Sequence, residues 1–194
     1  ISLGLVGSEM CIRDSQTMLD DYKKHVDERA ELNIPPLPLD ADQTSELVSL
    51  LKEKNNDPDY LLNLLKERVP AGVDQAAYVK AAFLADITTG NASSPYISKI
   101  DAVEILGTML GGYNVEPLIR CLEIEELAET ASHVLGRTLL IFDAFNEIFE
   151  LSKKNKYAKK VIEEWADAKW FTEKEDIKDP VSYTHLTLPT ICSV

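Results

Sequence analysis

The sequence predicts an all-helical protein, a short α-solenoid of antiparallel helices with one long central helix. Between Met18 and Pro180, apolar residues recur at the spacing of helices that bury one face. The same stretch has no alternating or β-branched run of the kind that forms strands. Its loops are short and contain Asp, Asn, Gly and Pro, so antiparallel neighbours are the natural arrangement of the helices.

The N-terminal half predicts four helices separated by clear breaks. A first amphipathic helix is expected over Met18–Asn33, and the prolines of Pro35–Pro38 then require an extended segment. Asp40, Asp57 and Asp74 each stand where an aspartate side chain can cap the next helix, because its oxygen accepts from the free N–H groups of the first turn.

The middle of the chain carries the densest apolar pattern. A helix that begins after Ser98 is expected to stop at Gly111–Gly112, and Asn114 is placed to cap the helix that follows. From Glu125 to Lys153 the helical period continues without a proline, which predicts one long helix against which shorter helices stack. Gly136 lies within it. Since a glycine inside a helix costs stability, we expect it to allow close approach of a neighbouring helix.

Asn155 marks a break, and a last helix follows with its apolar stripe on Tyr157, Val161, Trp165 and Ala168. Three large side chains gather at this end of the chain: Trp165, Trp170 and Phe171. They belong either to the core or to a face that docks onto another part of the protein. Both interpretations stay open.

A weak internal repeat supports the solenoid interpretation. A leucine-rich helix is followed by Pro70–Gly72 and Asp74, and a similar apolar helix is followed by Gly111–Gly112 and Asn114. The offset of roughly 40–45 residues is the period of HEAT-type repeats, in which paired helices stack on their neighbours.

The composition excludes several classes of function. The chain has 33 acidic and 20 basic residues and a net charge of −13, which argues against binding to nucleic acid or to an anionic membrane surface. No apolar run is long enough to span a bilayer. Cys11, Cys121 and Cys192 are odd in number and far apart, so we expect no disulfide framework and a cytoplasmic location.

The two ends differ from the middle. Residues 1–17 and 181–194 resemble translated sequencing-library adaptor, with LVGSEMCIRDS at one end and VSYTHLTLPT at the other. We therefore expect both flanks to be foreign to the native protein, with Met18 as the native start. The helical domain is then predicted to cover residues 18–180.

The candidates for chemistry have simpler structural interpretations. His133 could serve as a general base, but a solvated helix-face histidine fits its surroundings in the sequence. Cys121 could be a reactive thiol, but it lies among apolar residues and fits a buried position. Acidic residues cluster at a helix start, where they favour the helix dipole: Glu123, Glu125, Glu126 and Glu129. The sequence therefore predicts no catalytic, cofactor-binding or metal-ligating residue.

Four runs of the chain resemble a known family. MLDDYKKHVDERA, RVPAGVDQAAYVKAAFLADI, EILGTMLGGYNVEPLI and WADAKWF are similar to the N-terminal, HEAT-like helical domain of bacterial aconitate hydratase B. The similarity covers essentially Met18 to Pro180 in order and without large gaps. Because several of the runs are long, the resemblance is more specific than a short motif.

The resemblance implies a domain of a lyase. The full-length family interconverts citrate and isocitrate through cis-aconitate, in the tricarboxylic acid cycle, and many members also act on 2-methylisocitrate. It uses a [4Fe–4S] cluster whose unligated iron acts as a Lewis acid. In the family the helical domain is followed by a swivel domain and by the domains that hold the cluster, so no cluster ligand is expected in this chain.

By the same resemblance, the helical domain shapes a substrate tunnel and packs against the downstream swivel and catalytic domains. It also offers a surface for a protein partner or for self-association. The alternative is a stand-alone α-solenoid that binds a protein and has no enzyme attached. Reading the gene past Pro180 distinguishes the two, because a domain of the enzyme must be followed by several hundred further codons.

Overall fold

The computed structural model describes residues 6–138 and 144–167, with side chains from Thr17 onward. Within these residues the chain forms helices joined by turns and one extended segment, which confirms the all-helical class. The helices in chain order are α1 (Val6–Glu31), α2 (Ala41–Lys52), α3 (Pro58–Asn63), the π-helix η1 (Leu64–Arg68), α4 (Gln75–Thr89), α5 (Lys99–Gly107), α6 (Val115–Cys121), α7 (Ala128–Gly136), α8 (Phe145–Ser152) and α9 (Lys156–Ala166).

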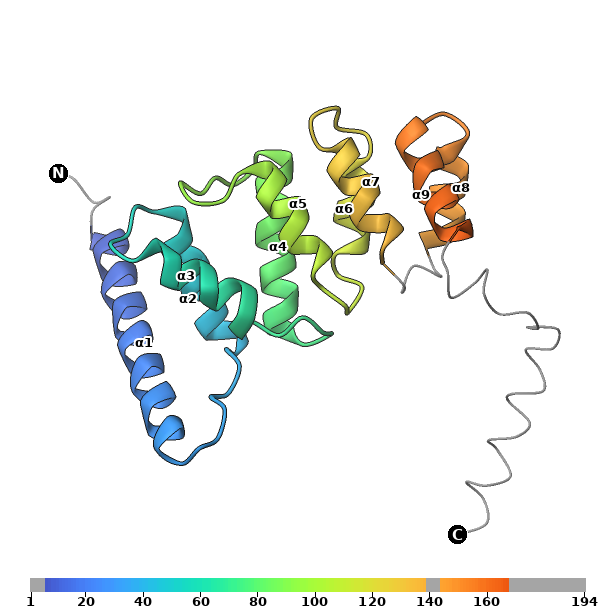
Figure 1. Ribbon diagram of the computed structural model, residues 1–194. Coiled ribbons are helices and arrows are strands. Elements are labelled where there is room, and N and C mark those ends of the chain that lie inside the picture. Colours follow the sequence, from blue (N-terminus) through green and yellow to red (C-terminus); the bar gives the residue numbers. More distant parts are fainter. Residues whose placement is uncertain (1–5, 139–143, 168–194) are drawn as a thin grey trace, which may run out of the picture.

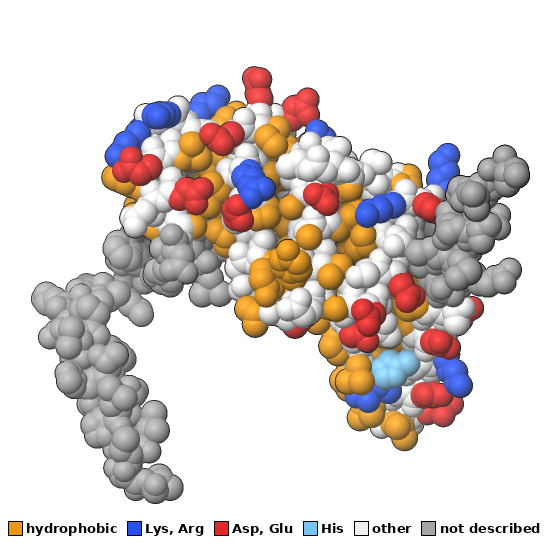
Figure 2. Space-filling model, turned by 180° about the vertical axis from the view of Figure 1, so that it is seen from behind, with side chains coloured by type: hydrophobic (Ala, Val, Ile, Leu, Met, Phe, Trp, Pro, Cys, Tyr) orange, Lys and Arg blue, Asp and Glu red, His pale blue; other side chains and the backbone are white. Residues whose placement is uncertain are grey.

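The helices form a row, with α1 at one end and α8 and α9 at the other (Figure 1), and the space-filling view from behind shows the same elongated body (Figure 2). The main contacts along the row are α1 with α2, α2 with α4, α4 with α5, α5 with α7, and α9 with both α7 and α8. The buried apolar side chains form one continuous core from Met18 on α1 to Val161 on α9. Packing mainly between near neighbours is what a stack of helices produces. The repeat period itself stays a prediction.

The helix starts predicted at Asp40, Asp57 and Asp74 are confirmed. The Asp40 carboxylate accepts from the Gln43 N–H at 2.8 Å, and the Gln43 side chain accepts from the Asp40 N–H, which completes a capping box. Asp57 and Asp74 accept in the same way at the starts of α3 and α4. The extended segment lies between α1 and α2, where its prolines exclude a regular helix.

The prediction of one long helix over Glu125–Lys153 is wrong. α7 ends at Gly136, and α8 begins at Phe145; residues 139–143 lie outside the described part of the chain. The Trp165 indole N–H donates to the Leu135 carbonyl at 3.0 Å, which gives that helix-end acceptor a partner outside its own helix. α9 packs against both α7 and α8. The helical spacing of apolar residues over Glu125–Lys153 therefore comes from two helices that both pack against α9. Such spacing shows which residues are buried and does not show that the helix is continuous.

The first helix begins earlier than expected. α1 starts at Val6, inside the flank 1–17, rather than at Met18, and it ends at Glu31. The flank has no proline or glycine after Gly7, so its backbone can continue the helix. That residues 1–17 and 181–194 are foreign stays a prediction, and the second of these flanks lies outside the described residues.

The turns of the predicted repeat lie side by side. The N–H groups of Leu110 and Gly111 donate to the Ala71 carbonyl at 2.8 and 3.2 Å. A Cβ atom on Gly111 would overlap the backbone carbonyl of Gly72, so this close pairing requires glycine at position 111. The two turns thereby join the α3–α4 part of the row to the α5–α6 part.

Asn114 does not use its side chain to cap α6. Its amide group instead donates to the carbonyls of Leu106 and Met109, at 2.8 and 3.1 Å, and so satisfies the C-terminal end of α5. Asn114 therefore stabilises a helix end, as predicted, but that end belongs to α5 and not to α6. Among the described residues, no helix is both long and apolar enough to cross a membrane.

Candidate functional site

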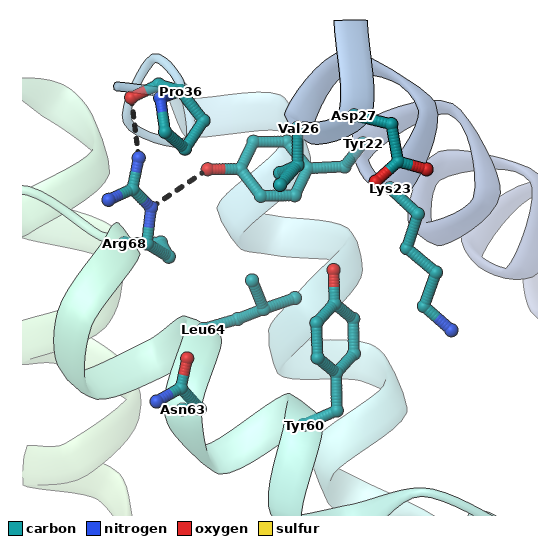
Figure 3. Close-up of a pocket in the computed structure, with 9 residues that line it drawn as sticks. All are labelled: Tyr22, Lys23, Val26, Asp27, Pro36, Tyr60, Asn63, Leu64 and Arg68. Atoms are coloured by element: carbon teal, nitrogen blue, oxygen red, sulfur yellow. Dashed lines mark hydrogen bonds between the residues drawn. The ribbon is translucent and has the colours of Figure 1, made fainter. Parts of the chain in front are cut away.

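A pocket of about 410 Å³ lies between α1, the extended segment and the α3–η1 pair (Figure 3). Its lining combines apolar side chains with polar and charged ones. The lining residues are Tyr22, Lys23, Val26, Asp27, Pro36, Tyr60, Asn63, Leu64 and Arg68. Figure 3 places Arg68 on one side of the pocket and Lys23 on the other, with the Tyr60 hydroxyl between them.

Arg68 holds one wall of the pocket in place. Its Nε–H donates to the Tyr22 hydroxyl at 3.1 Å, and its Nη2 group donates to the carbonyl of Pro36. Tyr22 in turn donates to the Leu37 carbonyl at 2.7 Å. The prolines keep this segment out of a regular helix, so its carbonyl groups have no helical N–H partners. The side chains of Arg68 and Tyr22 donate to them instead.

The backbone of η1 helps to place these groups. In η1 the Val69 N–H bonds to the Leu64 carbonyl, five residues back, which widens the helical turn. Asn63, Leu64 and Arg68, in or next to this turn, all line the pocket. Single π-turns of this kind are frequent at functional sites.

Tyr60 and Lys23 lie on the side of the pocket away from Arg68 (Figure 3). The Lys23 ammonium lies 4.8 Å from the centre of the Tyr60 ring, within the range of a cation–π contact. Burial, followed by Tyr22 and the carboxylates of Asp57 and Asp27, raises the pKa of Tyr60. The phenol therefore keeps its proton at neutral pH and is available as a donor.

The structure does not place His133 and Cys121, the two candidates for chemistry in the sequence, in one site. His133 is exposed on α7, whereas Cys121 is buried on α6. Burial raises the pKa of the Cys121 thiol, and a hydrogen bond with Thr88 opposes this only in part, so the thiol stays protonated. His25 accepts from the Leu37 N–H at 3.1 Å and so helps to fix the extended segment.

The other candidates have structural roles. The side chains of the acidic cluster, Glu123, Glu125, Glu126 and Glu129, are exposed before and at the start of α7. Gly136 lies against α9, where an added Cβ would overlap the Glu164 side chain, which confirms the expected close approach. Trp165 is partly buried against the core. Trp170 and Phe171 lie outside the described residues.

The described residues do not fit an iron–sulfur cluster. Such a cluster needs several cysteine thiolates, and the one cysteine whose side chain is described, Cys121, is fully buried. The described side chains also contain no group of three or more His, Cys, Asp or Glu residues able to hold a metal ion. No chemical step is therefore assigned to a cluster in this chain.

The pocket was missed in the sequence analysis. Tyr22 and Lys23 belong to the first helix predicted over Met18–Asn33, but neither they nor Arg68 were predicted to line a site. The available signal was the proline segment, whose carbonyl groups had to find side-chain partners. The π-turn that directs Arg68 toward them has no comparable sequence signature.

Comparisons with known proteins identify relatives that match most of the helical row. A family model described as the aconitate B N-terminal domain matches residues 21–171. Aconitate hydratase B of Synechocystis is 47% identical over 175 residues, which cover 89% of this chain and 20% of the relative. The Pseudomonas aeruginosa protein of the same name is 48% identical over 174 residues, with 89% and 20% covered. That of Escherichia coli is 49% identical over 169 residues, with 86% and 20% covered. The chain thus spans about a fifth of the length of these curated relatives.

Proposed function

Because the chain belongs to the aconitate B N-terminal domain family, we propose that it is the amino-terminal helical domain of an aconitate hydratase. The family match over most of the described helices carries this proposal. The parent enzyme would interconvert citrate and isocitrate through cis-aconitate in the tricarboxylic acid cycle, with 2-methylisocitrate as a further substrate. A cytoplasmic location goes with this activity.

In that enzyme the helical row acts as a packing and tunnel-shaping module that also offers a surface for protein interaction. Its partners are the downstream swivel domain and the catalytic domains, and the catalytic domains would hold a [4Fe–4S] cluster. The separate environments of Cys121 and His133 support a role without catalytic residues, because one is sealed in the core and the other faces solvent. The continuous core supports a rigid body against which other domains can rest.

A chimera tests the proposal. The N-terminal fifth of the Escherichia coli relative is replaced with residues 18–180 of this chain, and the turnover of citrate to isocitrate is measured. We expect the chimera to be active and the 194-residue chain alone to be inactive. The relative without its N-terminal fifth gives the baseline. A chimera that folds, holds its cluster and is no more active than this baseline would favour a stand-alone interaction module.

A further inference from the structure

The pocket between α1 and η1 has more positive than negative charge, in a chain whose net charge is −13. Lys23 and Arg68 contribute two cations to its lining, and Asp27 contributes one carboxylate. Within the described residues, neither cation forms a salt bridge, whereas the adjacent Lys24 pairs with Glu28 at 3.8 Å. The two pocket cations therefore lack the carboxylate partner that a surface lysine commonly finds in an acidic protein.

Several hydrogen-bond donors of this pocket remain open to a ligand. Arg68 uses Nε and Nη2 to hold the wall, and its third nitrogen points away from the other lining residues (Figure 3). The donors left for a ligand therefore come from Lys23, Tyr60 and Asn63. The Tyr60 phenol keeps its proton, and the Asn63 amide lines the same opening (Figure 3). Ammonium, phenol and amide groups are all donors to anionic oxygens.

We propose that this pocket binds a small dianion, a phosphate or dicarboxylate compound. The volume of about 410 Å³ lies in the usual range for small-molecule sites. Arg68 is held by three hydrogen bonds, so its charge is fixed before a ligand arrives. Lys23 lines the opposite side of the pocket, beside Tyr60 (Figure 3). This inference does not depend on the proposed function, because it concerns only residues of this chain.

Binding is measured on the full 194-residue chain by isothermal titration calorimetry. Inorganic phosphate and succinate are the probes, and sodium chloride at matched ionic strength controls for screening of surface charge. We expect saturable binding of at least one probe, and the two arms show whether the site prefers phosphate or carboxylate oxygens. Arg68 is left unchanged because it supports the wall.

Two pairs of variants on α1 locate the site. We expect Lys23→Gln to weaken binding and Asp27→Asn to strengthen it, each by about three- to fivefold, as for one partly exposed charge pair. Lys24→Gln and Glu28→Gln make the same charge changes outside the pocket and are expected to leave the affinity unchanged. The proposal is overturned if neither probe binds beyond the chloride control. It is also overturned if the two pairs of variants respond alike, since that result reports the overall charge of the protein and not a site.

Discussion

Lys80 brings an ammonium group into the core of the row. It lies on α4, which packs between α2 and α5, and it is only 1% exposed. Burial lowers the pKa of Lys80 to about 8, and the carboxylate of Glu67 offsets this in part. At neutral pH Lys80 is therefore still protonated, although burial disfavours its charged form. The buried charge lowers the free energy of unfolding.

Replacing this lysine should stabilise the protein. We expect Lys80→Met to raise the free energy of unfolding at pH 7 by on the order of 1–3 kcal/mol. Between pH 8 and about 10.4, the unfolded chain binds the lysine proton while the folded chain has lost it, so the wild type gains stability as the pH rises. The advantage of the variant should shrink over this range in urea unfolding. Lys66→Met, at an exposed position, is the control; a constant advantage of Lys80→Met at every pH would contradict the argument.

Asn114 is a second residue whose chemistry is set by burial. It is 1% exposed, and its amide donates to two carbonyls at the end of α5, while its own side-chain oxygen has no hydrogen bond. An amide is needed here because both neighbours are acceptors. An aspartate of nearly the same shape would place a third acceptor, and a charge, against them.

We therefore expect Asn114→Asp to destabilise the protein by about 3 kcal/mol or more at pH 7, and Asn114→Ala by about 1–3 kcal/mol. Acidification should restore part of the stability of the aspartate variant, because a protonated carboxyl can donate to one of the carbonyls. Chemical denaturation at pH 7 and pH 4 checks this order. Asn146→Asp on the exposed side of α8 makes the same change without burial. Equal effects at positions 114 and 146 would show that the amide of Asn114 does not act as described.

At the scale of elements, the paired turns join two parts of the row. Ala71 accepts from the N–H groups of Leu110 and Gly111, and the Tyr113 hydroxyl donates to the Val73 carbonyl at 2.9 Å. The rings of Tyr78 and Tyr113 meet edge to face, with their centres 5.4 Å apart. These contacts connect α4 to the turn before α6.

Gly111→Ala tests this connection. The added methyl group would overlap the backbone of Gly72, which cannot move aside like the end of a side chain, so the turns must separate. We expect a loss of about 2 kcal/mol in urea unfolding. Gly72→Ala is the matched control, because a Cβ there meets only the Asp74 side chain at 3.9 Å. A loss as large in the control as at Gly111 would mean that the backbone contact is not the cause.

The sequence predicted the helix starts better than the helix ends. Asp40, Asp57 and Asp74 were assigned correctly, because an N-cap depends on one side chain and the backbone beside it. The end of α7 was missed because it depends on the Trp165 indole and on the position of α9, which are contacts across the fold. The pocket was missed for the same reason, since Arg68 reaches Tyr22 and Pro36 from distant parts of the chain.

At the scale of the whole molecule, the row of near-neighbour contacts predicts that damage stays local. Among the described helices, α9 packs mainly on α7 and α8, whereas α2 packs mainly on α1, α3 and α4, so the main contacts of the two ends are with the helices next to them. In such a stack, each part opens with a free energy set mainly by its own neighbours. A change at one end should therefore leave the helices at the other end protected.

Gly136→Leu makes such a change between α7 and α9, where a larger side chain must displace Glu164. We expect a cost of about 1–3 kcal/mol and faster amide hydrogen exchange in α7 and α9, while α2 and α4 keep their protection. Gly136→Ala combined with Glu164→Ala makes room for a small side chain and should restore most of the protection. Uniform loss of protection from α2 to α9 would instead show that the row unfolds as one cooperative unit. The continuous core would then determine stability more than the contacts between neighbouring helices do.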